Sequence, residues 1–208
     1  MSNIIKIHPV NPQEKHIETA VKVLRNGGII ILPTDGVYSY AADIKQPKGL
    51  EKLARIKGKK VEESHFSFLF DDLSQVSDYT MQFDKSTFKV LKRGLPGPYT
   101  FILNANKSIP KIFQSRKSTI GIRMPDNKIA RMIVRELGNP IATTSVTDED
   151  SVIEYTTDPE LIQEKFGHTV DLVVDGGIGQ NVASTVIDLT QGEIELLRQG
   201  QGEVEQLL

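Results

Sequence analysis

The chain has 208 residues, of which 38% are hydrophobic and 25% are charged, a composition typical of a soluble globular protein. It contains no cysteine, which excludes disulfide bonds and thiolate metal sites. No apolar run approaches the ~20 residues of a membrane span, and the first residues lack the apolar segment of a signal peptide. We therefore expect a cytoplasmic protein that has no membrane partner.

Strands and helices alternate along the chain. The hydrophobic pattern predicts strands at 4–7, 29–32, 37–40, 66–70, 99–103, 119–124, 140–145, 170–174, 184–189 and 194–198. It predicts helices at 12–25, 47–57, 72–80, 85–93, 129–137 and 159–166, with Asn11 as the N-cap of the first. No repeat or linker interrupts this series. We expect a single α/β domain over residues 1–208, built around one sheet.

The most informative stretch is 28–38, where four apolar residues precede Pro33, Thr34, Asp35 and Gly36. Proline cannot donate to a β-ladder, so the buried strand should end there. A hydroxyl, a carboxylate and a glycine at the end of a buried strand indicate a ligand-binding rim. Asp35 is interpreted as an Asx-turn carboxylate rather than a catalytic base. The alternative is an ordinary strand–turn–strand corner.

Small hydroxyl residues and cations recur at the ends of the predicted strands. They are Thr34, Thr119, Arg123, Ser145, Ser184 and Arg198, and Lys57 and Lys59 follow the second predicted helix. Ligands of α/β sheets usually bind where strand ends converge, and these groups suit phosphates and a small polar substrate. Arg123 lies on an apolar strand, so its charge needs a partner. A Walker loop and a G-x-G-x-x-G fingerprint are absent, so a nucleotide site would be of another kind.

The net charge of −2 is unevenly distributed. Residues 45–135 contain 19 Lys and Arg against 8 Asp and Glu, a balance of +11, and the remainder has a balance of −13. This asymmetry indicates an anionic ligand for the middle of the chain. The alternative is that solvated helix faces are lysine-rich in this region.

Six motifs carry a resemblance to a known family. In chain order they are ILPTDGVY at 31–38, IKGK at 56–59, LPGPYT at 95–100, STIGIRMP at 118–125, PIATTS at 140–145 and STVIDL at 184–189. Through them the chain resembles the YrdC-like domain family, the threonylcarbamoyl-AMP synthases and their relatives, over nearly its whole length. The resemblance is strongest to the YciO-like branch of that family.

The chain departs from the synthase pattern at two signatures. The synthases carry Lys-x-Arg where this chain has Lys57 and Lys59, and Ser-x-Asn where it has Ser145 and Thr147. Lys59 keeps the charge but lacks the guanidinium fork, and Thr147 lacks the paired donor and acceptor of an amide. The first motif differs as well, at two further positions, Gly36 and Ser39. A weak or altered activity is the expected consequence.

The resemblance implies an α/β fold with a twisted mixed sheet, flanking helices and a deep basic cleft. It implies an L-threonylcarbamoyladenylate synthase that uses L-threonine, bicarbonate and ATP for the t6A modification of tRNA. Mg²⁺ would arrive with the nucleotide, and no metal ligand is assigned to the protein. The implied nucleotide-binding residues are Lys57, Lys59, Thr119, Ser145, Thr147 and Arg198. Thr34, Tyr38, Arg123 and Ser184 would bind L-threonine, and the catalytic residues would be Lys57, Lys59 and Arg123.

Two other functions remain open. One is a binding module of the same fold that holds double-stranded RNA or tRNA without this chemistry, which the +11 segment favours. The other is carbamoyl-adenylate chemistry on a different acceptor, as in the YrdC-like domains of hydrogenase-maturation factors. The sequence leaves the oligomeric state open.

Overall fold

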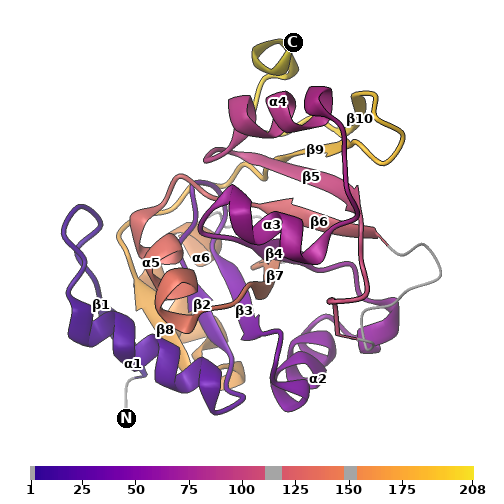
Figure 1. The fold of residues 1–208 in the computed structure, drawn as a ribbon. Helices are drawn as coiled ribbons and strands as arrows, with labels where there is room; N and C mark the ends of the chain where they lie inside the picture. Colours follow the sequence, from indigo (N-terminus) through magenta and orange to yellow (C-terminus); the bar gives the residue numbers. More distant parts are fainter. Residues whose placement is uncertain (1–2, 111–118, 148–153) are drawn as a thin grey trace.

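The computed structural model describes residues 3–110, 119–147 and 154–208 (Figure 1). Ser118 of the fourth motif and the acidic loop at 148–150 lie outside these ranges. Within them, no helix combines the length and the apolarity that crossing a membrane requires.

The core of the molecule is one mixed sheet of ten strands, in the order β1-β8-β2-β3-β7-β4-β6-β5-β9-β10. The pairs β1–β8, β8–β2, β4–β6 and β5–β9 are parallel, and the others are antiparallel. The strands are β1 Ile4–Lys6, β2 Ile30–Leu32, β3 Ser39–Asp43, β4 Ser67–Leu69, β5 Tyr99–Asn104, β6 Thr119–Arg123, β7 Ile141–Ser145, β8 Leu172–Asp175, β9 Thr185–Asp188 and β10 Glu195–Arg198. The predicted mixed α/β sheet is confirmed.

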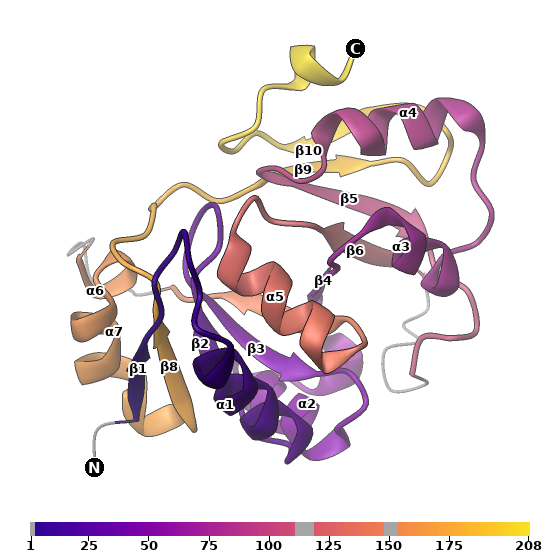
Figure 2. The same cartoon turned by 60° about the vertical axis from the view of Figure 1, so that its left-hand side comes forward.

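Helices cover both faces of this sheet (Figures 1 and 2). They are α1 Glu14–Arg25, α2 Pro47–Ile56, α3 Leu73–Tyr79, α4 Lys85–Gly94, α5 Lys128–Leu137, α6 Glu154–Thr157 and α7 Pro159–Phe166. Helices α1 and α5 pack together on one face, where Ile17 and Ile133 belong to the same buried cluster as Ile30 and Ile141. Within α1 and within α5 the buried apolar residues recur at three- and four-residue spacing, which places them on one side of each helix.

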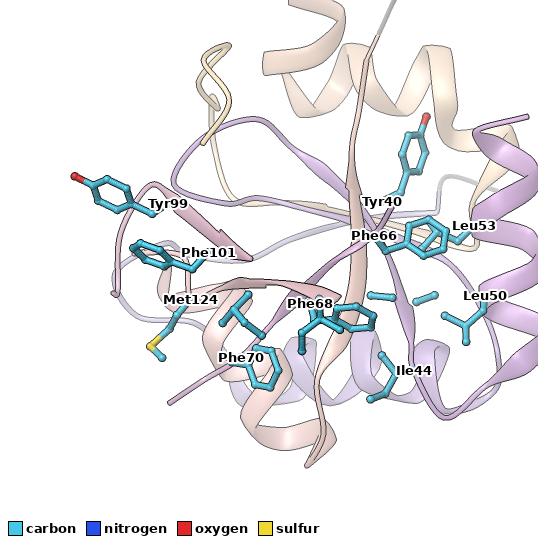
Figure 3. Packing of buried hydrophobic residues seen from close by; sticks show 14 of the residues in the cluster. Tyr40, Ile44, Leu50, Leu53, Phe66, Phe68, Phe70, Tyr99, Phe101 and Met124 are labelled. Atoms are coloured by element: carbon cyan, nitrogen blue, oxygen red, sulfur yellow. The ribbon is translucent and has the colours of Figure 1, made fainter. Parts of the chain in front are cut away.

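The opposite face carries the larger hydrophobic cluster. Figure 3 shows its side chains extending from Leu50 and Leu53 of α2, past Phe68, to Tyr99 and Phe101 of β5. Tyr99 and Phe101 stack with ring centroids 5.7 Å apart. The sheet is thus packed on both faces, with one buried apolar cluster on each.

Four helices begin with a side-chain cap, whereas α1 and α2 have none at their N-cap residues, Gln13 and Gln46. The side chains of Asp72, Asp84, Asn127 and Asp158 accept hydrogen bonds from the first-turn N–H groups of α3, α4, α5 and α7. The prediction of Asn11 as the N-cap of α1 is wrong, because that cap is Gln13. The N–H groups of Val10 and Asn11 both donate to Nδ1 of His8, so these residues form a separate turn before the helix.

The strand predicted at 37–40 begins later, at Ser39. The carbonyl of Val37 accepts the Thr34 hydroxyl, so Val37 belongs to the turn between β2 and β3. The short helix α6 and the 3₁₀ turns at Val61–Glu63, Gly167–Thr169 and Val204–Leu207 were not predicted. Segments this short carry too few periodic residues to be recognised.

Candidate functional site

A cavity of about 350 Å³ lies on the sheet, with hydroxyl groups along its wall. Ser39 of β3 pairs with Ser145 of β7, and Ser67 of β4 pairs with both Thr143 of β7 and Gly121 of β6. All five residues line the cavity. A Cβ at position 121 would lie 3.2 Å from Cγ2 of Thr100, so this glycine keeps the cavity floor open.

The position of α5 explains where this cavity begins. Ile141 of β7 and Leu69 of β4 are buried in the cluster formed with α1 and α5. Alternate residues of a strand share a face, so Thr143 and Ser67 point to the same side as Ile141 and Leu69. The face therefore changes from apolar beneath the helix to hydroxyl-bearing in the cavity.

Arg123 provides a buried cation at the cavity wall. Its Nη2 donates to Oδ1 of Asp35 at 2.8 Å, and the side chains of Arg123 and Asp35 are 7% and 9% exposed. Burial lowers the pKa of Arg123 and Asp35 partly restores it, but a guanidinium remains protonated in proteins. The sequence required a partner for this charge, and Asp35 is that partner.

Asp35 does not form the predicted Asx-turn. The N–H of Gly36 donates to Oγ1 of Thr34 at 3.0 Å, and that hydroxyl donates to the carbonyl of Val37 at 2.9 Å. The second oxygen of Asp35 accepts the N–H of Asp126 at 2.9 Å. The threonine hydroxyl thus closes the turn, which leaves both carboxylate oxygens for partners on a distant segment. Thr34 is not among the residues that line the cavity. It is connected to the cavity through the next residue, Asp35, which pairs with Arg123.

Ser184, which directly precedes β9, and Arg198, at the end of β10, also line the cavity. The Oγ atom of Ser184 is 2.8 Å from Oγ1 of Thr100, and its carbonyl accepts a hydrogen bond from Nη2 of Arg198 at 2.8 Å. Arg198 is close enough to Arg123 to lower the pKa of Arg123 by charge repulsion. In the part of the chain that the structure describes, no carboxylate lies within ion-pair distance of Arg198.

Lys57 reaches the cavity rim from the end of α2. Its Nζ donates to Oγ1 of Thr147 at 3.0 Å and to the carbonyl of Ser145 at 3.4 Å. Partial burial, reinforced by the charge of Lys59, lowers the pKa of Lys57. Ser145 itself lines the cavity, so Lys57 and Thr147 form a rim beside it.

Two predicted site residues lie elsewhere. Lys59 lines a separate open groove of about 620 Å³, together with Arg55 and Lys60. Tyr38 is fully buried, and its hydroxyl donates to the carbonyl of Gly177 and accepts the N–H of Gly176. Burial raises the pKa of Tyr38, which keeps the phenol neutral in its role of holding the β8–β9 loop. The cavity itself brings together Thr119, Arg123, Ser145, Ser184 and Arg198.

Other lining residues were not singled out from the sequence. Ser67, Thr100 and Thr143 contribute hydroxyls, and His65 is an exposed imidazole at the edge. The three hydroxyl residues lie in strands whose sequences show an ordinary alternation of apolar and polar residues, so nothing in the sequence marks them as site residues. Only the strand order β7-β4-β6-β5 in the sheet shows that they share a cavity.

Seven cations of segment 45–135 lie on two helices, three on α2 and four on α4, and these helices lie at opposite ends of the molecule in both views (Figures 1 and 2). Binding of double-stranded RNA or tRNA stays a prediction. Filter-binding titrations that show weaker affinity at physiological than at low salt would support it.

No group of three or more His, Asp or Glu side chains in the described ranges is arranged to hold a metal ion.

Comparisons with known proteins agree with these features. The uncharacterized protein YciO of Escherichia coli is 37% identical over the full length of both chains, and its crystal structure superposes with a TM-score of 0.90. A protein of Nitrosococcus oceani named threonylcarbamoyl-AMP synthase is 26% identical, over 82% of this chain and 91% of its own.

A second similar structure is that of P. abyssi Sua5 complexed with L-threonine. It is 26% identical, with a TM-score of 0.87, and the match covers 98% of this chain and 59% of that one. The model of the Sua5, YciO and YrdC protein family, described as telomere recombination, matches residues 22–200. The chain therefore belongs to the Sua5/YciO/YrdC family.

Proposed function

We propose that this protein is a nucleotidyltransferase of the L-threonylcarbamoyladenylate synthase type, whose product would serve the t6A modification of tRNA. The observation that carries the proposal is a hydroxyl-lined cavity whose wall includes Arg123, Ser184 and Arg198. Support comes from the N. oceani relative named threonylcarbamoyl-AMP synthase and from the similar structure that holds L-threonine.

The proposed reaction places two anions in contact. L-Threonine and bicarbonate lose water to give a carbamate, whose oxygen attacks the α-phosphorus of ATP while pyrophosphate leaves. Cations must offset the repulsion between the carbamate and the phosphates, and Mg²⁺ bound to ATP would contribute. We assign Arg198, Lys57 and Lys59 to the nucleotide, together with the polar groups of Thr119, Ser145 and Thr147. Arg123, Ser184, Thr34 and Tyr38 are assigned to the amino acid, by direct contact or through the turn and loop they hold.

No protein nucleophile is needed for this chemistry. Catalysis would come from positioning and from charge stabilisation, which together supply most of the acceleration in phosphoryl-group chemistry. The hydroxyls of Thr100 and Ser184 are hydrogen-bonded at 2.8 Å, so the side chain of Ser184 is already oriented before substrate arrives.

The direct test measures pyrophosphate release with ATP, bicarbonate and Mg²⁺, in the presence and absence of L-threonine. We expect release that depends on threonine and is slow, because Lys59 and Thr147 replace the arginine and asparagine of the synthase signatures. Release that is the same without threonine would refute the proposal.

The lowered pKa of Lys57 gives the nucleotide site a pH dependence. Burial disfavours the ammonium form, so Lys57 should lose its charge at a lower pH than a free lysine, for which the pKa is about 10.4. Affinity for an ATP analogue should therefore begin to fall below that pH. In Lys57→Arg the guanidinium stays charged, and the decline should disappear. Lys60→Arg is the control, and an unchanged decline in Lys57→Arg would contradict the assignment of Lys57.

A further inference from the structure

Asp35 has a role that its place in the turn does not explain. Both of its oxygens accept hydrogen bonds from a segment nearly ninety positions away, one from the guanidinium of Arg123 and one from the N–H of Asp126. The hydroxyl of Thr34 already satisfies the N–H of Gly36. The carboxylate is therefore available to act on Arg123.

The ion pair fixes the guanidinium at the cavity wall. Its members come from the β2–β3 turn and from the end of β6, and each side chain is less than 10% exposed. The Nε of Arg123 is buried and has no hydrogen-bond partner. A buried donor without an acceptor is unfavourable and is uncommon in native proteins outside functional sites. Asp35 thus holds Arg123 in an orientation that leaves one donor of the guanidinium, Nε, without a hydrogen bond.

The two arginines of the cavity differ in charge balance. Arg123 faces a carboxylate at 2.8 Å, whereas Arg198 has no acidic partner among the described residues. Arg198 is also the more exposed of the two. The cavity therefore holds one compensated and one uncompensated positive charge.

We propose that Asp35 is a positioning residue that fixes Arg123 at the cavity wall and cancels its charge, so that Arg198 supplies the uncompensated positive charge to a bound anion. This inference rests on the proposed synthase function. Loss of the Asp35 carboxylate then has two effects of opposite sign. The cavity becomes more positive and binds anions more tightly, while Arg123 loses the geometry needed for turnover.

The test compares Asp35→Asn with Asp126→Asn. Both variants remove one negative charge near the same turn, but the side chain of Asp126 is exposed and is not paired with Arg123. Calorimetric titration with inorganic pyrophosphate should show affinity about tenfold higher in Asp35→Asn, since a buried charge is little screened. Asp126→Asn should bind like the wild type. Threonine-dependent turnover should fall about 100-fold in Asp35→Asn alone.

A second variant, Asp35→Glu, separates geometry from charge. It keeps the carboxylate but moves it by one methylene, so pyrophosphate affinity should stay at the wild-type value while turnover falls. Circular dichroism melts establish that each variant is folded, and if Asp35→Asn does not fold, Asp35→Glu decides the question. Equal pyrophosphate affinity in the two Asn variants, or normal turnover in Asp35→Glu, would overturn the proposal. Absence of threonine-dependent release in the wild type would refute the synthase function alone, because the pyrophosphate comparison still tests Asp35.

Discussion

Arg123→Ala should lower the free energy of unfolding by about 3–5 kcal/mol and abolish threonine-dependent pyrophosphate release. The destabilisation arises because the buried carboxylate of Asp35 would lose the guanidinium that compensates it. Loss of threonine dependence follows from the assignment of Arg123 to the amino acid. Urea denaturation gives the change in stability, and pyrophosphate release with and without threonine gives the change in function.

Two controls separate this effect from a general loss of an ion pair. Arg135 also pairs with a carboxylate, that of Asp71 at 2.8 Å, but its side chain is 65% exposed. Arg135→Ala should therefore cost no more than about 1 kcal/mol. Removing both members of the buried pair, in Arg123→Ala with Asp35→Ala, should destabilise less than the sum of the single variants. Additive single effects would show that the pair contributes no coupling.

The second large effect is a gain of activity. Lys59→Arg combined with Thr147→Asn restores both synthase signatures, and the turnover rate should rise about 10²–10³-fold, the equivalent of about 2–4 kcal/mol in the barrier. The structure is compatible with the second change, because an asparagine oxygen can accept from Lys57 as Oγ1 of Thr147 does at 3.0 Å. Rates of the single and double variants with ATP, L-threonine and bicarbonate provide the measurement.

Lys60→Arg is the matched control, because Lys60 lines the same open groove as Lys59 and lies outside the signature. It should leave the rate unchanged. The two restoring changes act on one nucleotide, so their effects need not add. A double variant that binds ATP but remains inactive would show that the altered signatures are not the limiting defect. The branch would then have a different substrate or no adenylation chemistry, and RNA binding without this chemistry would become the leading hypothesis.

The order of elements could be predicted from hydrophobic periodicity, because each strand and each longer helix carries its own pattern. The order of strands in the sheet could not. In the sheet, β8 lies between β1 and β2, and β7 lies between β3 and β4. Both β7 and β8 are far in the sequence from the strands on either side of them. Such pairings depend on which buried faces fit together, and no local pattern records that.

The candidate site, too, could be predicted only in part from the sequence. Residue type alone identified Arg123 as a charge in need of a partner, and its motif placed it at a strand end. The partner itself was assigned to a different role, because Thr-Asp-Gly offers two side chains that can close a turn. The structure gives that role to Thr34 and so leaves Asp35 for Arg123. Which of two neighbouring polar side chains closes a turn, and which one pairs with a distant residue, is decided by tertiary contacts.

The wall of the cavity is assembled from β3, β4, β5, β6, β7, β9 and the end of β10, which span residues 39–198. A fold with so many non-local pairings closes late and slowly, since each pairing must offset the entropy of a long loop. The binding site should consequently appear only with the last cooperative step of folding, and no fragment that ends before β9 should bind ligand. Amide exchange at Ser39, Gly121 and Thr143 should then slow together on ligand binding, by the amount that the ligand stabilises the whole protein.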